Sequence, residues 1–232
     1  MRIRIFSDTG KLAEAAAAEI ATWLRLDAGS PSVGLAGGST PREAYRLLRS
    51  ASLEWDDVHV WMTDERFVPA DHPDSNVGMA RAALADHVPA RFHEVPHLPG
   101  DPEGSAAAYD KELGSFLGWS NGLAPGLVLL GMGADGHTAS LFPGTAALEV
   151  AERRYVANWV PDRGEWRLTA SLPLLGAARR TMFLVAGAAK AAAVARVLEG
   201  DGSDPAAQVS DASRDAVWLL DREAAGALSR SY

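Results

Sequence analysis

Short apolar runs alternate along the chain with longer segments whose apolar residues recur at helical spacing. The run Leu127–Leu130 is typical of a buried strand, whereas Leu12, Ala16 and Ile20 mark one face of a helix. This alternation favours an α/β fold with a mostly parallel open sheet and helices on both faces, a Rossmann-like three-layer arrangement. No linker or internal repeat interrupts the pattern, so we expect residues 1–232 to form a single domain.

The expected elements follow from the same pattern. The strands are 2–6, 32–35, 58–62, 127–130, 181–185 and 217–220, with a further pair, 154–159 and 167–171, that predicts a small added hairpin region. The helices are 11–26, 41–50, 76–86, 190–198 and 222–228, and another begins after Asp101, an N-cap followed by proline.

Composition narrows the function classes. The chain has no cysteine, which excludes disulfides and thiolate chemistry, and its formal net charge of −8 disfavours nucleic acid as a partner. A small phosphorylated substrate stays possible, because it needs only a few local positive groups. No apolar stretch is long enough for a signal peptide or a membrane span, so we expect a cytoplasmic protein with no membrane partner, a monomer or weak homodimer.

A glycine-rich turn follows the apolar run 127–130 and reads Gly-Met-Gly-Ala-Asp-Gly-His from Gly131 to His137. Ligands usually bind where a parallel strand ends in such a turn, and a histidine there can accept a proton near neutral pH. Asp135 either orients the His137 imidazole or points away from it around Gly136. Because a lone histidine is more often structural than catalytic, the pattern alone leaves both interpretations open.

The same turn satisfies G-x-G-x-x-G, the fingerprint of dinucleotide-binding sites, but lacks its context. Pro143 and Gly144 would end any helix that began at His137 within two turns. The acidic residue expected about 20 positions later is also missing, because the segment around Val156 contains no acid. A nicotinamide cofactor is therefore not expected, and the glycines are better explained by close backbone approach to a ligand.

A second small-residue turn precedes the predicted helix 41–50. Backbone N–H groups of Gly37, Gly38, Ser39 and Thr40 could hold a phosphate at the start of this helix. The segment is not a P-loop, because the lysine of that motif is missing. In the alternative interpretation these residues need no ligand, since Thr40 and Glu43 fit a capping box with Pro41 at the first helical position.

Three cations complete the candidate set. Arg66 could bind an anion or stabilise an oxyanion, with Asp64 or Glu65 holding its guanidinium group, or could form a surface ion pair of little consequence. Arg167 and Lys190 are either phosphate ligands or ordinary solvated charges. No G-x-S-x-G or H-E-x-x-H motif appears, so neither an acyl-enzyme serine nor a zinc site is expected.

Taken together, these segments resemble the 6-phosphogluconolactonase family, within the superfamily that includes glucosamine-6-phosphate deaminase and ribose-5-phosphate isomerase. The related deaminases carry an acid shortly after the histidine, where this chain has Ser140, Leu141 and Phe142, and tend to have tyrosine in place of Arg66. Ala170 and Gly176 depart from the lactonase pattern. The resemblance covers nearly the whole chain and includes 34–41, 63–66, 74–76, 130–143, 167–169, 172–175 and 187–190.

The resemblance implies hydrolysis of 6-phospho-D-glucono-1,5-lactone to 6-phosphogluconate in the oxidative pentose phosphate pathway, with no metal or organic cofactor. His137 would then be the general base, accompanied by Asp135, Asp64 and Arg66 in the catalytic set. The segment 37–40 with Arg167 and Lys190 would hold the phosphate of this small phosphorylated lactone. A related sugar-phosphate deaminase or isomerase, and a non-catalytic sugar-phosphate sensor, are the alternatives.

Overall fold

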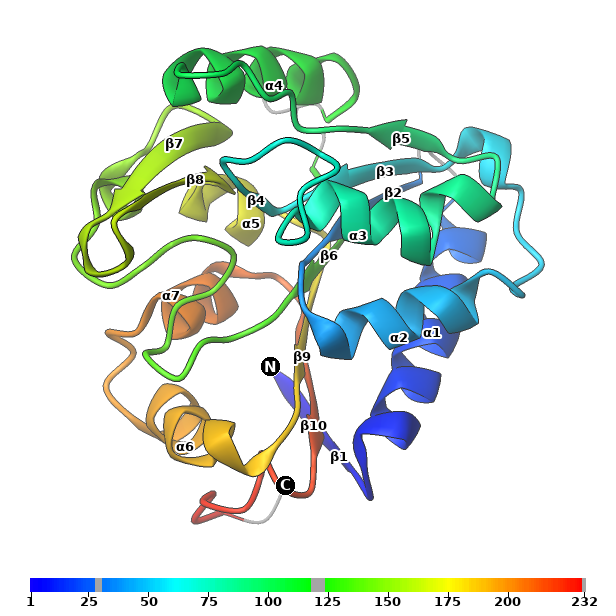
Figure 1. Cartoon of the computed structure of the whole chain (residues 1–232). Coiled ribbons are helices and arrows are strands. Elements are labelled where there is room, and N and C mark those ends of the chain that lie inside the picture. Colours follow the sequence, from blue (N-terminus) through cyan, green and yellow to red (C-terminus); the bar gives the residue numbers. More distant parts are fainter. Residues whose placement is uncertain (28–30, 118–123, 231–232) are drawn as a thin grey trace.

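The computed structural model describes residues 1–27, 31–117 and 124–230, and its centre is a seven-stranded parallel sheet (Figure 1). All neighbouring strands in this sheet run parallel, as the sequence predicted. The strand order is β1 (Arg2–Phe6), β10 (Ala216–Asp221), β9 (Arg180–Val185), β6 (Leu127–Leu130), β2 (Ser32–Leu35), β3 (His59–Met62) and β5 (Arg91–His93).

Helices cover both faces of this sheet (Figure 1). On one side lie α1 (Thr9–Leu26), α2 (Ser39–Leu48) and α3 (Asn76–Ala83), and on the other lie α6 (Ala191–Glu199) and α7 (Pro205–Ala212), with the short α5 (Leu172–Gly176) packed on α7. The arrangement confirms the expected α/β class. Single 3₁₀ turns occur at Trp55–Asp57, Ala85–His87, Ala146–Glu149, Pro161–Arg163 and Ala188–Lys190.

A separate three-stranded antiparallel sheet contains β4 (Asp64–Arg66), β8 (Glu165–Ala170) and β7 (Tyr155–Val160), and α4 (Pro102–Phe116) packs on it. The β7–β8 pair is the predicted hairpin region. Because β4 begins two residues after β3 ends, it connects this small sheet to the end of the large one. Arg66 on β4 lies directly opposite Arg167 on β8.

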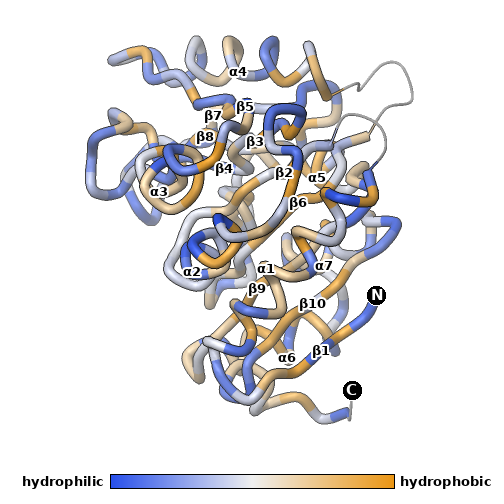
Figure 2. Tube along the Cα trace, turned by 90° about the vertical axis from the view of Figure 1, so that its right-hand side faces the viewer, coloured by the Kyte–Doolittle hydropathy of each residue, from blue (hydrophilic) through white to orange (hydrophobic). Residues whose placement is uncertain are grey.

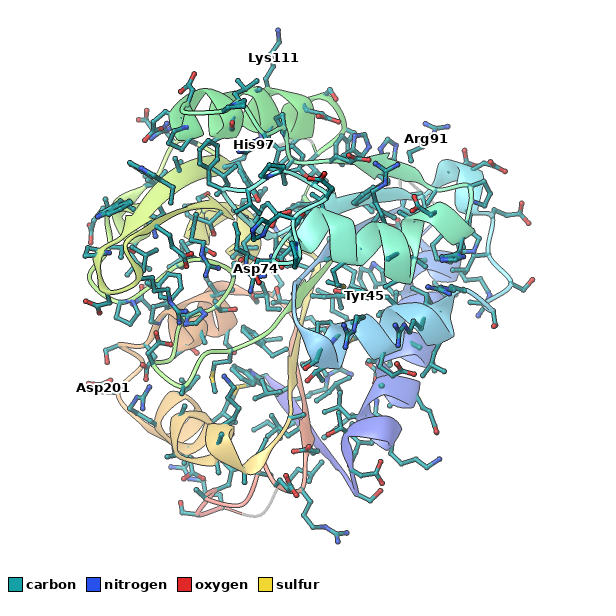
Figure 3. The ribbon with its side chains drawn as sticks, viewed as in Figure 1. Tyr45, Asp74, Arg91, His97, Lys111 and Asp201 are labelled. Carbon is teal, nitrogen blue, oxygen red and sulfur yellow. The ribbon has the colours of Figure 1, made fainter. Side chains whose placement is uncertain are left out.

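The core is built from the apolar strand residues, and β6, β9 and β10 appear mainly orange in the hydropathy view (Figure 2). Every residue of β6 is buried, which explains why its sequence is a continuous apolar run rather than an alternating one. Tyr45 points from α2 into the interior, where its hydroxyl donates to the carbonyl oxygen of Ala36 and accepts from the backbone N–H of the same residue (Figure 3). Tyr45 thereby ties α2 to the chain that leaves β2.

Several expected boundaries were wrong. Residues 222–228 form turns rather than a helix, and the helix expected at 41–50 spans Ser39–Leu48. The helix expected at 76–86 ends at Ala83 and continues as a 3₁₀ turn. The strands β4 and β5 and the helix α7 were not expected. Within the described residues, no helix is long and apolar enough to cross a membrane.

Candidate active site

A cavity of about 310 Å³ opens at the carboxyl ends of four neighbouring strands, β9, β6, β2 and β3. This edge of a parallel sheet is where ligands bind in open α/β folds. All the sequence-predicted site residues line the cavity except Asp135. The lining comprises 36–41, Asp64, Arg66, Asn76, 131–133, His137, Ala139, Arg167, 184–186 and Lys190.

Asp135 lies behind His137 and holds its ring. The Nδ1 atom of His137 is 2.5 Å from Oδ1 of Asp135, and the backbone N–H of His137 donates to the same oxygen at 3.3 Å. With Nδ1–H donating to the carboxylate, Nε2 is left with a free lone pair and can accept a proton. The ring also stacks on Phe142, with 4.1 Å between ring centroids, so its plane is fixed on two sides.

Burial determines the charge state of this pair. It lowers the pKa of His137 below its usual 6.5, and this effect outweighs the Asp135 carboxylate, which acts to raise it. Burial alone would raise the pKa of Asp135, but the His137 imidazole and the hydrogen bonds that Asp135 accepts lower it below its usual value. At neutral pH the pair is therefore a neutral imidazole beside an ionised carboxylate, as a general base requires.

The contact between His137 and Asp135 explains why the turn has glycine at positions 133 and 136. A Cβ atom at position 133 would overlap both Nδ1 of His137 and Oδ1 of Asp135. Gly136 has a φ of 83°, in the left-handed region that favours glycine, and lets the chain turn between the two side chains. The turn is closed by backbone hydrogen bonds from Gly133 N–H to the His137 carbonyl at 2.9 Å and from Gly136 N–H to the Gly133 carbonyl at 3.1 Å.

Arg66 and Arg167 meet across the β4–β8 register on one side of the cavity. Arg167 is held by Glu165, which accepts from its Nε and Nη2 at 2.9 and 2.5 Å. Arg66 donates from Nη1 to the carbonyl oxygen of Asp74 at 2.6 Å, on the loop before α3 (Figure 3). The Nε atom of Arg66 is buried and has no hydrogen-bond partner among the described residues, while the residue itself lines the cavity.

The expectation that Asp64 or Glu65 holds the Arg66 guanidinium was wrong. The Asp64 side chain is buried and accepts from Oγ of Ser140 at 2.7 Å and from Nδ2 of Asn76 at 3.4 Å. Successive residues of a strand point to opposite faces, so Glu65 points away from Arg66. Asp64 is on the same face as Arg66, but its carboxylate is held by Ser140 and Asn76 instead.

Glu65 has a structural position at the start of α3. Its carboxylate accepts from the backbone N–H groups of Arg66, Asn76 and Val77, each at 2.7 Å, and from Oγ of Ser75 at 2.9 Å. Burial nevertheless raises the pKa of Glu65 above its usual value. An acid at a helix N-terminus stabilises the helix dipole, and here it also fixes the loop that Arg66 contacts.

The start of α2 contradicts the predicted capping box. Gly38, with a φ of 110°, is the N-cap, and no side chain caps the helix. Thr40 is therefore the second helical residue and Pro41 the third, so neither is in the position that the capping box requires. The first N–H groups of a helix need a partner, and Gly37, Gly38, Ser39 and Thr40 all line the cavity. This geometry suits a bound anion.

Lys190 also lines the cavity. It belongs to a 3₁₀ turn, Ala188–Lys190, that follows β9. In the part of the chain that the structure describes, no carboxylate forms an ion pair with it. The same part holds no group of three or more His, Asp or Glu side chains with the geometry of a metal site. The cavity thus combines a base at the end of β6 with cations from β4, β8 and the turn after β9.

Sequence reasoning missed several contributors. Asn76 lies against Gly37, where a Cβ atom would overlap its side-chain amide, and Ala139 lines the cavity with a φ of 48°. Phe142, the platform under His137, was named from the sequence only as one of the residues that stand where the related deaminases carry an acid. Only tertiary contacts identify these residues, because no local spacing distinguishes a stacking phenylalanine from one in the core.

Comparison with known proteins identifies the family. Residues 7–218 match the model of a family described as glucosamine-6-phosphate isomerases/6-phosphogluconolactonase. The 6-phosphogluconolactonase of Synechocystis sp. is 41% identical over 203 residues, covering 84% of each chain. That of Streptomyces coelicolor is 36% identical over 247 residues, covering 98% of this chain and 94% of the relative.

The chain belongs to this family. The fold agrees: the solved 6-phosphogluconolactonase of Trypanosoma brucei matches with a TM-score of 0.86 and 29% identity, covering 98% of both chains. The matched segment 7–218 contains every cavity residue named above. The resemblance inferred from the sequence motifs is therefore confirmed.

Proposed function

We propose that the protein hydrolyses 6-phospho-D-glucono-1,5-lactone to 6-phospho-D-gluconate, the lactone step of the oxidative pentose phosphate pathway. The observation that carries the proposal is the neutral His137 imidazole, oriented by Asp135, in a cavity whose lining also includes Arg66, Arg167 and Lys190. Relatives with more than a third of their residues identical carry the name 6-phosphogluconolactonase.

In this mechanism the Nε2 atom of His137 accepts a proton from a water molecule as the water oxygen attacks the lactone carbonyl carbon. A δ-lactone is an activated ester, so no covalent intermediate is needed. The bond between the carbonyl carbon and the ring oxygen then breaks, and the imidazolium returns its proton to the leaving ring oxygen. General-base catalysis of this kind contributes about 10²–10⁴-fold to the rate.

The carbonyl oxygen gains negative charge during the attack, and Arg66 is the donor that we assign to it. Arg66 lines the same cavity as His137, and its guanidinium group carries a fixed positive charge. A preorganised donor to an oxyanion contributes about 10²–10³-fold. Asp64, held by Ser140 and Asn76, places an acceptor in the same cavity and would bind a sugar hydroxyl group.

We assign the phosphate to the uncapped start of α2, formed by Gly37, Gly38, Ser39 and Thr40, together with Arg167 and Lys190. Binding the phosphate at a distance from the reacting carbon fixes the lactone in orientation, so that remote binding energy favours the attack. The family also contains glucosamine-6-phosphate isomerases, and a deaminase or isomerase activity on a sugar phosphate is the alternative.

One comparison of two substrates tests the proposal. The purified protein should accelerate loss of the phosphorylated lactone well above its spontaneous hydrolysis, measured as acid release at constant pH. It should release no ammonia from glucosamine 6-phosphate under the same conditions. Ammonia release without lactone hydrolysis would establish the alternative instead.

We also propose that residues 1–232 act as one domain in the cytoplasm, as a monomer or weak homodimer. The large and small sheets both contribute to the single cavity, which supports one functional unit. Sedimentation of the purified protein over a range of concentrations measures the oligomeric state.

A further inference from the structure

Asp204, the residue before α7, departs from the usual behaviour of aspartate at a helix start. An aspartate at the N-cap normally accepts hydrogen bonds from the first N–H groups of its own helix. The Asp204 side chain accepts no capping hydrogen bond from the backbone N–H groups of α7. It instead forms an ion pair with Arg196 of α6, whose Nε lies 3.0 Å from Oδ2 and whose Nη2 lies 3.2 Å from Oδ1.

This ion pair lies against the turn that carries His137. A Cβ atom at Gly136 would overlap the Asp204 carboxylate, so the backbone of the turn lies directly on that group. The N–H of Ala206, in the first turn of α7, donates to the carbonyl oxygen of Gly136 at 3.0 Å. The Nη2 atom of Arg196 also reaches the carbonyl oxygen of Ala134, at 3.5 Å. The N-terminus of α7 is thus bound to the turn between Asp135 and His137.

Asp221 makes an equivalent connection to the turn that follows β9, the strand next to β6. It is the last residue of β10, its exposed fraction is 2%, and it does not line the cavity. Both of its carboxylate oxygens accept from the backbone N–H of Gly187, at 3.0 and 3.1 Å. They also accept from the N–H of Ala224 at 2.8 Å and from Oγ1 of Thr9 at 2.9 Å.

The contact with Gly187 reaches Lys190 in one further step. Gly187 has a φ of 93°, and its carbonyl oxygen accepts from the backbone N–H of Lys190 at 3.0 Å. Fixing the Gly187 peptide therefore fixes the 3₁₀ turn that directs Lys190 to the cavity. An ionised carboxylate bound to several donors is a strong anchor, because charge-assisted hydrogen bonds are about twice as strong as neutral ones.

We propose that Asp204, with Arg196, and Asp221 are positioning residues for two different turns of the active site. Asp204 holds the turn that carries the base, His137, and Asp221 holds the turn that carries the phosphate ligand, Lys190. The inference rests on the proposed function, because it assigns chemistry to the turn after β6 and phosphate binding to the turn after β9. The two residues should therefore have separable effects on catalysis and on binding.

The kinetic test compares the phosphorylated lactone with unphosphorylated glucono-1,5-lactone. Asp204→Ala should lower kcat about 10- to 100-fold on both lactones, since small displacements of a reacting group cost up to about 10²-fold, and should leave KM unchanged. Asp221→Asn turns one acceptor oxygen into a donor that faces other donors. It should raise KM for the phosphorylated lactone about 10-fold and leave kcat/KM for the unphosphorylated lactone unchanged.

Asp204→Ala and Asp221→Asn should change different kinetic parameters, so each is a control for the other. Asp211→Asn, on the exposed surface of α7, is a control for both. If Asp204→Ala does not fold, Arg196→Gln replaces it and should have the same kinetic effect. If Asp221→Asn does not fold, Asp221→Ser replaces it in the same way. A folded Asp204 variant with normal kcat, or one that raises KM for the phosphorylated lactone only, would overturn the assignment.

Hydrogen exchange separates this inference from the proposed function. In Asp204→Ala the amides of residues 133–137 should exchange faster and those of 187–190 should not, and Asp221→Asn should show the reverse. This pattern is expected whatever the substrate is. If the wild-type protein does not hydrolyse the lactone, the proposed function fails on its own. If exchange rises equally in both segments, or in neither, the positioning roles are wrong.

Discussion

The imidazole of His137 and the carboxylate of Asp135 form a hydrogen-bonded pair, with Nδ1 2.5 Å from Oδ1, although only one residue separates them in the chain. The turn can close this tightly because position 133 has no side chain and Gly136 adopts a positive φ. In the proposed mechanism the pair acts as an oriented, uncharged base.

Replacing Gly133 by alanine should separate the pair while leaving the fold intact. The added methyl group meets the ends of two side chains rather than backbone, so both can move away. We expect kcat to fall about 10- to 100-fold because the base is displaced. Gly114→Ala in α4, far from the cavity, is the matched control and should keep normal kcat. A Gly133→Ala enzyme with wild-type kcat would show that the contact between Asp135 and His137 is dispensable.

The pH dependence of kcat/KM should report the burial of His137. A base works when neutral, so activity is lost as pH falls through its pKa, and burial places that pKa below 6.5. The acid limb should therefore lie below pH 6.5. Asp135→Asn removes the charge that raises the pKa, so its acid limb should move to still lower pH while kcat falls. An acid limb that moves upward in this variant would contradict the assigned electrostatics.

Arg167 should discriminate the phosphorylated lactone from the unphosphorylated one. Arg167→Ala removes a cation that Glu165 holds at the cavity wall, and we expect KM for the phosphorylated lactone to rise about 10- to 100-fold. KM for glucono-1,5-lactone should stay nearly constant. Steady-state kinetics on both lactones provide the measurement. An equal loss on both would mean that Arg167 does not bind phosphate.

Glu65 should matter for stability rather than for the chemical step. In Glu65→Gln an amide group replaces one of two oxygens that together accept four hydrogen bonds, which leaves buried donors unpaired. We expect the free energy of unfolding to fall by about 1–3 kcal/mol in urea denaturation. Glu43→Gln, at an exposed pair with Arg46, should change it by less than about 0.5 kcal/mol. Equal effects of the two substitutions would refute the structural role.

The central strands of the large sheet could be predicted from the sequence because they are buried on both faces. The apolar run Leu127–Leu130 needs no tertiary information to be recognised, and Asp101 followed by Pro102 marks the start of α4 by local chemistry alone. The small sheet was only half predicted. Its strand Asp64–Arg66 consists of three charged residues, and it is a strand only because β8 supplies its hydrogen-bond partners.

The start of α2 shows why a correct motif can still be misplaced. Thr40, Pro41 and Glu43 satisfy the capping-box pattern, yet Gly38 adopts a φ of 110° and the helix begins at Ser39. Gly37, the residue before Gly38, lies against Asn76, a residue from another helix. The position of the candidate site at the sheet edge was predictable from strand ends, whereas the partners of its residues depend on contacts between distant segments.

The central claim is that His137 activates the attacking water. The most direct test is kcat for hydrolysis of 6-phospho-D-glucono-1,5-lactone by His137→Gln, corrected for spontaneous hydrolysis, with His87→Gln at an exposed position as the control. The mechanism predicts that kcat falls about 10²–10⁴-fold while KM stays within a factor of about two and the control is unaffected. A His137→Gln enzyme that retains near-normal kcat would show that another group is the base.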